Sequence, residues 1–253
     1  MHELENKVAV ITGSAGGIGF GIAEAFAELG ARIVLTDINE QALAAAKEKL
    51  EDTYKVKVMA LTADGRDEAA VKKTIEMVGK EFGSIDAMIN NAQTSKSGVA
   101  LIDHSYEDFA LAIETGLYAA FYYMKYSFPY LKKSRGCVIN FASGAGLSGG
   151  SGQASYAAAK EGIRGMSRVA AREWGEFGIN VNVVCPLAMT KRLEQWKEEF
   201  PDAYAKNIQN IPLQRFGDPK QDIGRVCVFL ASDAASYISG ETISVQGGSG
   251  LRP

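Results

Sequence analysis

Short apolar runs alternate with longer stretches of helical periodicity along most of the chain. The apolar runs are residues 8–11, 33–35, 56–61, 85–89, 137–141 and 179–184. The helical stretches are residues 18–29, 40–50, 68–82, 106–131 and 153–177. Parallel strands are buried on both faces, so they are apolar throughout, and helices usually connect them. The pattern therefore predicts an α/β fold: a doubly wound parallel sheet with helices on both faces.

Length and composition favour one domain. The 253 residues contain no proline-rich, serine-rich or highly charged linker, so we expect a single domain over residues 1–253. Lys and Arg total 27 against 30 Asp and Glu, a formal net charge of -3 without a long basic block, which argues against a nucleic-acid partner. The first residues are too polar for a signal peptide, and no stretch is long and apolar enough to span a bilayer. We therefore expect a cytoplasmic protein without a membrane partner.

Cysteines and histidines favour neither a disulfide framework nor a metal site. Cys137, Cys185 and Cys227 are far apart in sequence, and the first two lie in apolar runs. Three cysteines cannot all pair within one chain, so we expect reduced thiols. His2 and His104 have no metal-ligand spacing to another candidate. The sequence therefore predicts no bound metal.

Six residues suited to a binding site stand at or just after the ends of different predicted strands. They are Thr12, Asp37, Asp64, Asn90, Ser143 and Pro186. In a doubly wound sheet, ligands bind beyond the carboxyl ends of the strands, near the point where the strand order reverses. We therefore expect these residues to line one edge of the sheet and to mark the functional site.

The turn between the first strand and the first helix is rich in glycine. It contains the expected cofactor-binding residues Gly13, Ser14, Gly17, Ile18 and Gly19. Missing side chains let the backbone approach a pyrophosphate, and the N–H groups at the helix N-terminus favour its charge. The alternative is a tight turn with close helix packing. The position after the first strand and before an amphipathic helix favours nucleotide binding.

Asp37 ends the second predicted strand, about twenty residues after the turn, where a carboxylate accepts hydrogen bonds from an adenosine ribose. The same charge repels a 2′-phosphate, and residues 12–19 contain no Arg or Lys that would bind one. The alternative is that Asp37 only caps the helix that begins near Asn39. We predict NAD(H) rather than NADP(H). Further cofactor contacts are expected at Ile38, Asp64, Gly65, Asn91 and Ala92, with Asp64 facing the adenine amino group.

Tyr156 and Lys160 are four residues apart in a predicted helix, so they lie on one face. A positive charge beside a phenol favours the phenolate and lowers the tyrosine pKa. An ordinary helix surface also contains such pairs, and only the surrounding motifs distinguish the two interpretations.

Taken together, these motifs resemble those of the short-chain dehydrogenase/reductase superfamily over essentially the whole chain. The matching residues are Thr12, Gly13, Gly17, Gly19, Asn90, Asn91, Ala92, Ser143, Tyr156, Lys160, Asn182, Pro186, Gly247 and Gly248. The text of residues 152–160 is most similar to the branch that contains 3-oxoacyl-carrier-protein reductases and hydroxysteroid dehydrogenases. The resemblance implies a Rossmann-type fold and a homotetramer or homodimer, with the long helices of residues 106–131 and 153–177 between subunits.

The resemblance also implies reversible hydride transfer between NAD(H) and a small-molecule ketone or secondary alcohol. Tyr156 would exchange the proton with the substrate oxygen, and Ser143 would donate a hydrogen bond to it. Lys160 would lower the Tyr156 pKa and hold the nicotinamide ribose. Tyr156 and Lys160 therefore count among the cofactor-binding residues, to which the resemblance adds Pro186, Ala188 and Thr190.

Several positions depart from the family pattern. Gly116 stands where an asparagine commonly holds a water that links the lysine to solvent, so the usual proton relay is in doubt. Gln93 and Leu187 each replace a glycine beside the expected pocket, and Gln246 replaces an aspartate. Thr190 lies one residue early for the threonine that contacts the nicotinamide amide.

The insertion at residues 187–217 is expected to cover the substrate, because it contains apolar residues at partly helical spacing. The alternative is a helix pair that buries one face against the body. We predict a hydrophobic substrate, which is steroid-like, alicyclic or a 3-oxoacyl group. The predicted substrate pocket comprises Gln93, Ser143, Ala145, Gln153, Tyr156, Leu187 and Trp196. The alternatives are a 3-oxoacyl-carrier-protein reductase and a nucleotide-binding regulator or scaffold that has lost catalysis.

Overall fold

The computed structural model describes residues 4–250. Seven parallel strands form one sheet in the order β3-β2-β1-β4-β5-β6-β7. The strands are β1 (Val8–Thr12), β2 (Arg32–Asp37), β3 (Val58–Thr62), β4 (Ala87–Asn90), β5 (Cys137–Phe141), β6 (Asn180–Pro186) and β7 (Thr242–Val245). The predicted doubly wound sheet is confirmed. β7 was not predicted, because this short edge strand is only partly buried and alternates polar with apolar residues.

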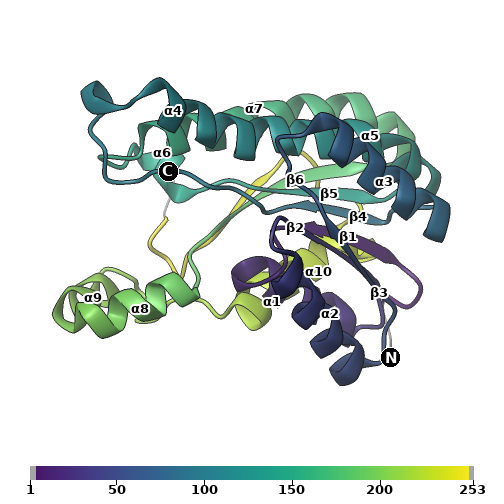
Figure 1. The fold of residues 1–253 in the computed structure, drawn as a ribbon, viewed down its shortest axis with the longest axis horizontal. Helices are drawn as coiled ribbons and strands as arrows, with labels where there is room; N and C mark the ends of the chain where they lie inside the picture. Colours follow the sequence, from purple (N-terminus) through teal and green to yellow (C-terminus); the bar gives the residue numbers. More distant parts are fainter. Residues whose placement is uncertain (1–3, 251–253) are drawn as a thin grey trace.

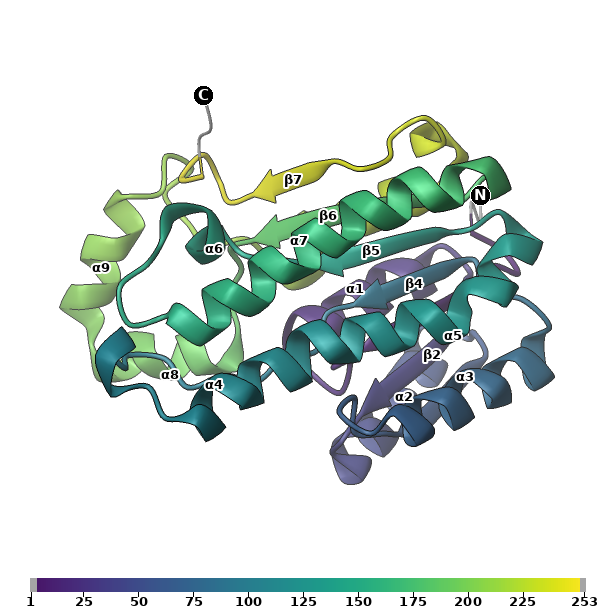
Figure 2. The same cartoon turned by 90° about the horizontal axis from the view of Figure 1, so that it is seen from above.

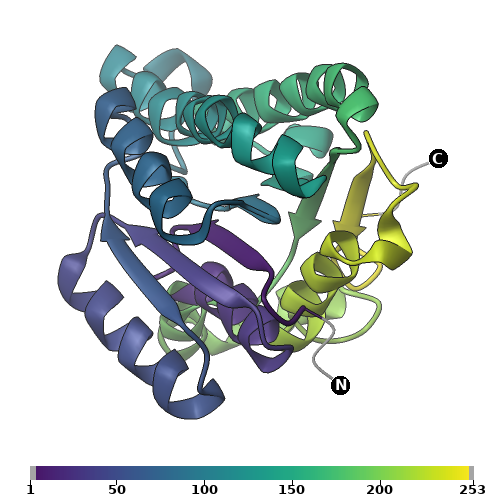
Figure 3. The same ribbon diagram turned by 90° about the vertical axis from the view of Figure 1, so that its right-hand side faces the viewer.

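Helices cover both faces of the sheet, as Figures 1 and 3 show. One layer contains α1 (Gly17–Glu28), α2 (Glu40–Tyr54) and α10 (Arg225–Ala231). The other contains α3 (Glu68–Phe82), α4 (Tyr106–Ala112), α5 (Ala119–Ser134), the short α6 (Gly144–Ser148) and α7 (Ala154–Trp174). Short 3-10 turns complete these layers at Leu101–Asp103, Gly175–Phe177 and Asp233–Ala235. No helix in residues 4–250 is both long and apolar enough to cross a membrane.

Alternate strand residues contribute to two separate hydrophobic cores. In β1, Ala9 and Ile11 pack with the layer of α1, α2 and α10, whereas Val8 and Val10 pack with the layer of α3, α5 and α7. All four are almost completely buried. This explains why the strand is apolar at every position: side chains alternate between faces, and both faces are covered.

The strand order reverses between β1 and β4. The chain builds outward from β1 to β2 and β3, then returns to the other side of β1 with β4. The loops that follow β1 and β4 therefore lie side by side at the carboxyl edge, where a ligand site is expected.

The helix predicted over residues 106–131 is interrupted. α4 ends at Ala112, a π-helical segment (η2, Ile113–Tyr118) follows, and α5 continues the same rod. The wider turn contains Gly116, which is buried. Single π-helical turns within α-helices are frequent at functional sites.

Two helices follow β6 in the segment predicted as an insertion. α8 (Lys191–Glu199) and α9 (Pro201–Gln209) lie at one end of the molecule, beyond the carboxyl edge of the sheet (Figure 2). A second π-helical segment, η4 (Pro219–Gly224), then leads into α10.

Candidate active site

The glycine-rich turn connects β1 with α1. Gly13 and Gly17 have φ angles of +63° and +56°, which side chains disfavour. A β-carbon on Gly19 would collide with the carbonyl oxygen of Gly13, so the third glycine permits close packing within the turn. A β-carbon on Gly17 would meet nothing, so the backbone there stays open. Close packing thus accounts for Gly19, and nucleotide binding at the open backbone of Gly17 stays a prediction.

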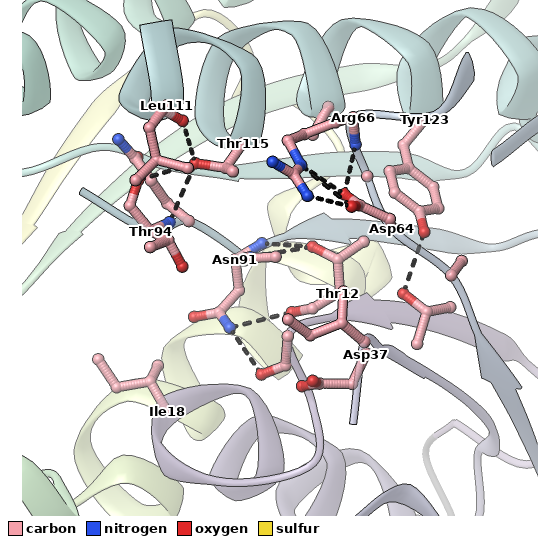
Figure 4. Close-up of a pocket in the computed structure, with 18 of the residues that line it drawn as sticks. Thr12, Ile18, Asp37, Asp64, Arg66, Asn91, Thr94, Leu111, Thr115 and Tyr123 are labelled. Carbon is pink, nitrogen blue, oxygen red and sulfur yellow. Dashed lines mark hydrogen bonds and ion pairs between the residues drawn. The ribbon is translucent and has the colours of Figure 1, made fainter. Parts of the chain in front are cut away.

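The same turn is fastened to the end of β4. The Asn91 amide nitrogen donates to the carbonyl oxygens of Thr12 and Gly13 at 3.0 and 3.2 Å. The backbone N–H groups of Asn91 and Ala92 both donate to Thr12 Oγ1 at 3.0 Å (Figure 4). These bonds join the two loops at the point where the strand order reverses.

Asp37 lies at the end of β2 beside the turn. Its carboxylate accepts hydrogen bonds from the backbone N–H groups of Ala15, at 3.2 Å, and Asn39, at 3.1 Å. Asn39, not Asp37, is the N-cap of α2, because its side chain accepts from Ala42. Ile38 is 69% exposed beside the carboxylate, which leaves an apolar surface at the mouth of the site.

Asp64 is already engaged by a residue that the sequence interpretation did not include. Arg66 forms a forked ion pair with it, with distances from 2.6 to 3.1 Å (Figure 4). Its hydrogen bonds hold the pKa of the Asp64 carboxyl below its usual range. The expected contact of Asp64 with an adenine amino group stays a prediction, for a carboxylate that already pairs with Arg66. The sequence did contain a signal for this ion pair, because the positively charged Arg66 follows Asp64 by only two residues.

A cavity of about 520 Å³ runs along this edge. Nine predicted cofactor residues line it: Gly13, Ile18, Asp37, Ile38, Asp64, Gly65, Asn91, Ala92 and Thr190. The lining also includes residues to which the sequence assigned no cofactor role, among them Thr36, Ala63, Arg66, Thr94, Leu111, Thr115, Ala119 and Tyr123. Tyr123 belongs to α5, and burial raises its pKa to about 12, so its phenol stays protonated.

Ser143, Tyr156 and Lys160 come together beyond β5. Ser143 is the N-cap of α6 and accepts from the Ala145 N–H at 3.2 Å. Tyr156 and Lys160 both lie in the first turns of α7, and the Lys160 Nζ is 5.6 Å from the centre of the Tyr156 ring. Lys160 is only 3% exposed and donates to the Phe141 carbonyl oxygen at 2.7 Å.

Burial controls the protonation of this pair. It lowers the pKa of Lys160 to about 7 and raises the pKa of Tyr156, although a hydrogen bond with Ser143 opposes the second shift. Burial thus opposes the lowering of the Tyr156 pKa that is expected from Lys160, and that expected effect stays a prediction. Desolvation disfavours both charged forms, and a lysine that loses its proton near neutrality no longer stabilises a phenolate.

The cavity fits a dinucleotide on structural grounds. α1 begins at Gly17, and no side chain caps its N-terminus. Its first N–H groups are thus available to an anion such as a pyrophosphate. The Asp37 carboxylate, at the end of β2, and Tyr156, near the start of α7, belong to the same carboxyl edge of the sheet.

Other residues that the sequence assigned to the site form structural contacts. Ser14 is fully buried, donates to the Ile11 carbonyl at 2.8 Å and accepts from the Thr36 N–H, so its side chain joins β1 to β2 instead of facing the cavity. Pro186 ends β6, and Leu187 bonds through its backbone to Val245 and Gly217.

Three further predicted positions lie around the cavity and not within its lining. Ala188 forms an isolated bridge with Gly217, and Gln153 forms one with Val99. Trp196 packs on Tyr204, with ring centres 6.1 Å apart, inside the arm formed by α8 and α9. The predicted substrate residue Trp196 therefore stabilises the arm in this conformation.

Comparisons with known proteins agree with this geometry. A family described as Enoyl-(Acyl carrier protein) reductase matches residues 13–250. A 12alpha-hydroxysteroid dehydrogenase from a Clostridium species is 56% identical over 259 residues and is covered completely, as is this chain. A 3-oxoacyl-(acyl-carrier-protein) reductase from Chlamydia muridarum is 36% identical over 97% of this chain and 98% of that protein.

Solved structures show the same fold with either nicotinamide cofactor. Levodione reductase is 30% identical with a TM-score of 0.91, and the match covers 98% of both chains. A xylitol dehydrogenase bound to NAD+ is 28% identical with a TM-score of 0.91, covering 97% of this chain and 100% of that one. An NADP complex from Pseudomonas aeruginosa has the same identity and TM-score, covering 99% and 98%.

Proposed function

The chain belongs to the short-chain dehydrogenase/reductase superfamily, and we propose that it interconverts a secondary alcohol and a ketone of a steroid-like substrate with NAD(H). Its general class is that of an alcohol dehydrogenase or ketone reductase. The observation that carries the proposal is the convergence of Ser143, Tyr156 and Lys160 at the edge of the sheet that also holds the dinucleotide cavity.

The catalytic side chains have distinct tasks in this proposal. The nicotinamide, when bound, supplies or accepts the hydride. Tyr156 donates its phenolic proton to the substrate oxygen during ketone reduction and accepts a proton during alcohol oxidation. Ser143 donates a hydrogen bond to the same oxygen as negative charge develops there. Lys160 is held by the Phe141 carbonyl. It exchanges a proton near neutral pH and helps to orient Tyr156, the proposed acid/base.

The preference for NAD(H) rests on Asp37. Its carboxylate lies beside the glycine-rich turn. There it would accept hydrogen bonds from the ribose hydroxyl groups and repel a 2′-phosphate. Arg66 lines this cavity, and its guanidinium is paired with Asp64. The pairing supports a site without an available clamp for an extra phosphate.

The steroid-like substrate is inferred from the relative that is 56% identical over its full length. The arm of α8 and α9 lies within the proposed covering segment of residues 187–217, and the rings of Trp196 and Tyr204 pack on each other there. A 3-oxoacyl-carrier-protein reductase is the second candidate, because relatives of that name match 97% of the chain at 36% identity.

A substrate panel tests the proposal. The protein is mixed with NAD+ and hydroxysteroids that differ in hydroxyl position, and in parallel with NADH and a 3-oxoacyl thioester, while nicotinamide absorbance is followed. Oxidation of a steroid alcohol, lost in Tyr156→Phe although NADH still binds, is the expected result. Cofactor binding without turnover across the panel would favour a regulator or scaffold, and thioester reduction alone would favour the second candidate.

We also propose that the enzyme assembles as a homotetramer through α5 and α7. Phe121 and Val169 are 44% and 54% exposed on these helices. They border a cavity of about 400 Å³ that also includes Met166 and Trp174. Val169→Glu should dissociate the assembly in light scattering, whereas Met77→Glu, at an exposed apolar residue of α3, should not. An unchanged mass for both would contradict this assembly.

A reducing compartment is the setting that we propose. Cys137, Cys185 and Cys227 are buried, and none of them forms a disulfide in the described chain. Reduced, buried thiols are typical of cytoplasmic proteins. Alkylation of the unfolded protein isolated from cells with a thiol reagent should modify all three cysteines.

A further inference from the structure

Gln93 fills the space beside Gly116. A β-carbon on Gly116 would lie 2.7 Å from Cδ, 2.8 Å from Oε1 and 2.9 Å from Nε2 of Gln93. These distances are shorter than side chains tolerate, so a side chain at position 116 and the present position of Gln93 exclude each other. The carboxamide thus enters, from the end of β4, a space that an amino acid on η2 would otherwise occupy.

The carboxamide of Gln93 is only half satisfied within the described chain. Its Nε2 donates a long hydrogen bond, 3.4 Å, to the carbonyl oxygen of Ala112, where α4 gives way to the π-helical turn. Its Oε1 is buried and has no hydrogen-bond partner. A buried acceptor without a donor lowers stability, so it indicates a group whose hydrogen bonding a hydroxyl or a water completes. Gln93 also lines the dinucleotide cavity.

The residues on either side of Gln93 form hydrogen bonds with two different segments of the site. Thr115 Oγ1 accepts from the Thr94 N–H at 3.1 Å, and its one hydroxyl hydrogen is shared between the Thr94 carbonyl, at 2.8 Å, and the Leu111 carbonyl, at 2.7 Å. On the other side of Gln93, Asn91 donates to the glycine-rich turn at Thr12 and Gly13. Residues 91–94 therefore connect the cofactor turn with η2.

The π-helical turn in turn contacts the catalytic helix. A β-carbon on Gly162 of α7 would lie 2.8 Å from Cδ2 of Leu117, so the two segments pack very closely. α7 carries Tyr156 and Lys160. η2 therefore contacts both Gln93 and the helix that holds Tyr156 and Lys160.

We propose that Gln93 is a polar positioning residue of the active site, matched to Gly116, and that its Oε1 accepts a hydrogen bond from a hydroxyl of bound cofactor or from an ordered water. This inference rests on the oxidoreductase function proposed above. It predicts that residues 93 and 116 act as a coupled pair. One of the two must supply the carboxamide that fills the space between them, and the other must leave that space free.

Four variants test the pair. Gln93→Leu retains the volume and removes the hydrogen bonds, and Gln93→Gly removes both. Gly116→Asn forces Gln93 out of its place. In the double variant Gln93→Gly with Gly116→Asn, the carboxamide at position 116 replaces the one lost at position 93 and fills the same space from η2. Gly165→Ala is the control for a helix glycine, because a β-carbon there meets nothing.

Gln93→Leu, Gln93→Gly and Gly116→Asn should each lower kcat about tenfold, as for the coupling of neighbouring residues, whereas Gly165→Ala should not. The double variant should recover to within about threefold of the wild type. A cofactor dissociation constant that rises in Gln93→Leu would identify a cofactor hydroxyl as the donor, and a changed pH profile at constant affinity would identify a water. Multiplicative losses in the double variant, or a fully active Gln93→Leu, would overturn the proposal.

A second measurement separates this inference from the proposed function. The melting temperatures of the same variants, with and without saturating NADH or NADPH, give a double-variant cycle that needs no substrate turnover. Non-additive shifts would support the pair even if no tested alcohol or ketone reacts. Additive shifts in a protein that does turn over substrate would reject the pair and leave the enzyme function intact.

Discussion

The Nζ of Lys160 lies 2.7 Å from the carbonyl oxygen of Phe141, so a backbone group at the end of β5 holds the proposed catalytic lysine. The group is almost fully buried, and burial lowers its pKa to about 7. A carbonyl hydrogen bond orients the ammonium without neutralising it. The lysine can therefore change its protonation state close to physiological pH.

This burial predicts a pH-dependent stability difference between the wild type and Lys160→Met. The folded-state pKa is near 7 and the unfolded value is 10.5, so the unfolded chain binds more protons between these limits. Wild-type stability should therefore rise relative to the variant as pH increases from 7 to 10, by at most about 1.4 kcal/mol per pH unit. Urea unfolding at several pH values measures the difference. A constant difference would show that the lysine is not desolvated.

The raised pKa of Tyr156 predicts opposite pH responses of the two reaction directions. Ketone reduction needs the protonated phenol, which a raised pKa preserves well above neutrality. Alcohol oxidation needs the phenolate, so its rate should increase through the alkaline range. Initial rates in both directions from pH 6 to 10 check this. An oxidation rate that is already maximal at pH 6 would contradict a raised pKa.

Asp37→Asn should weaken the discrimination against NADP(H). The amide oxygen still accepts a hydrogen bond from one of the two backbone N–H groups, but the charge that repels a 2′-phosphate is lost. The ratio of kcat/KM for NAD+ to that for NADP+ should fall about tenfold, the equivalent of about 1.4 kcal/mol. Glu40→Gln removes an exposed carboxylate three residues away and should leave the ratio unchanged. Equal ratios in the wild type and Asp37→Asn would reject this role.

Gly19→Ala should disrupt the cofactor turn, because a β-carbon there collides with the Gly13 carbonyl. Overpacking of this kind costs about 1 to 3 kcal/mol. We expect a lower denaturation midpoint and weaker NADH binding, followed by nicotinamide fluorescence. Gly16→Ala is the matched control within the same turn, since its β-carbon would meet nothing and its φ is -174°. Similar losses in both variants would point to the turn conformation instead of this contact.

Much of the candidate site follows from residue type and position. Asp37, Asn91, Ser143 and Tyr156 stand at strand ends or at the start of a helix, and every such position reaches the same edge of a parallel sheet. Arg66 was not identified, because an exposed arginine in a turn resembles any surface residue until its pairing with Asp64 is known.

The sequence by itself determined the alternation of strands and helices, because periodicity and apolar runs are local properties of the chain. It also determined which chemical groups reach the carboxyl edge. The tertiary structure alone decided that Gln93 occupies the space beside Gly116, and that burial moves the pKa values of Lys160 and Tyr156 as it does. These features depend on packing between segments that are far apart in sequence, and local patterns carry no record of that packing.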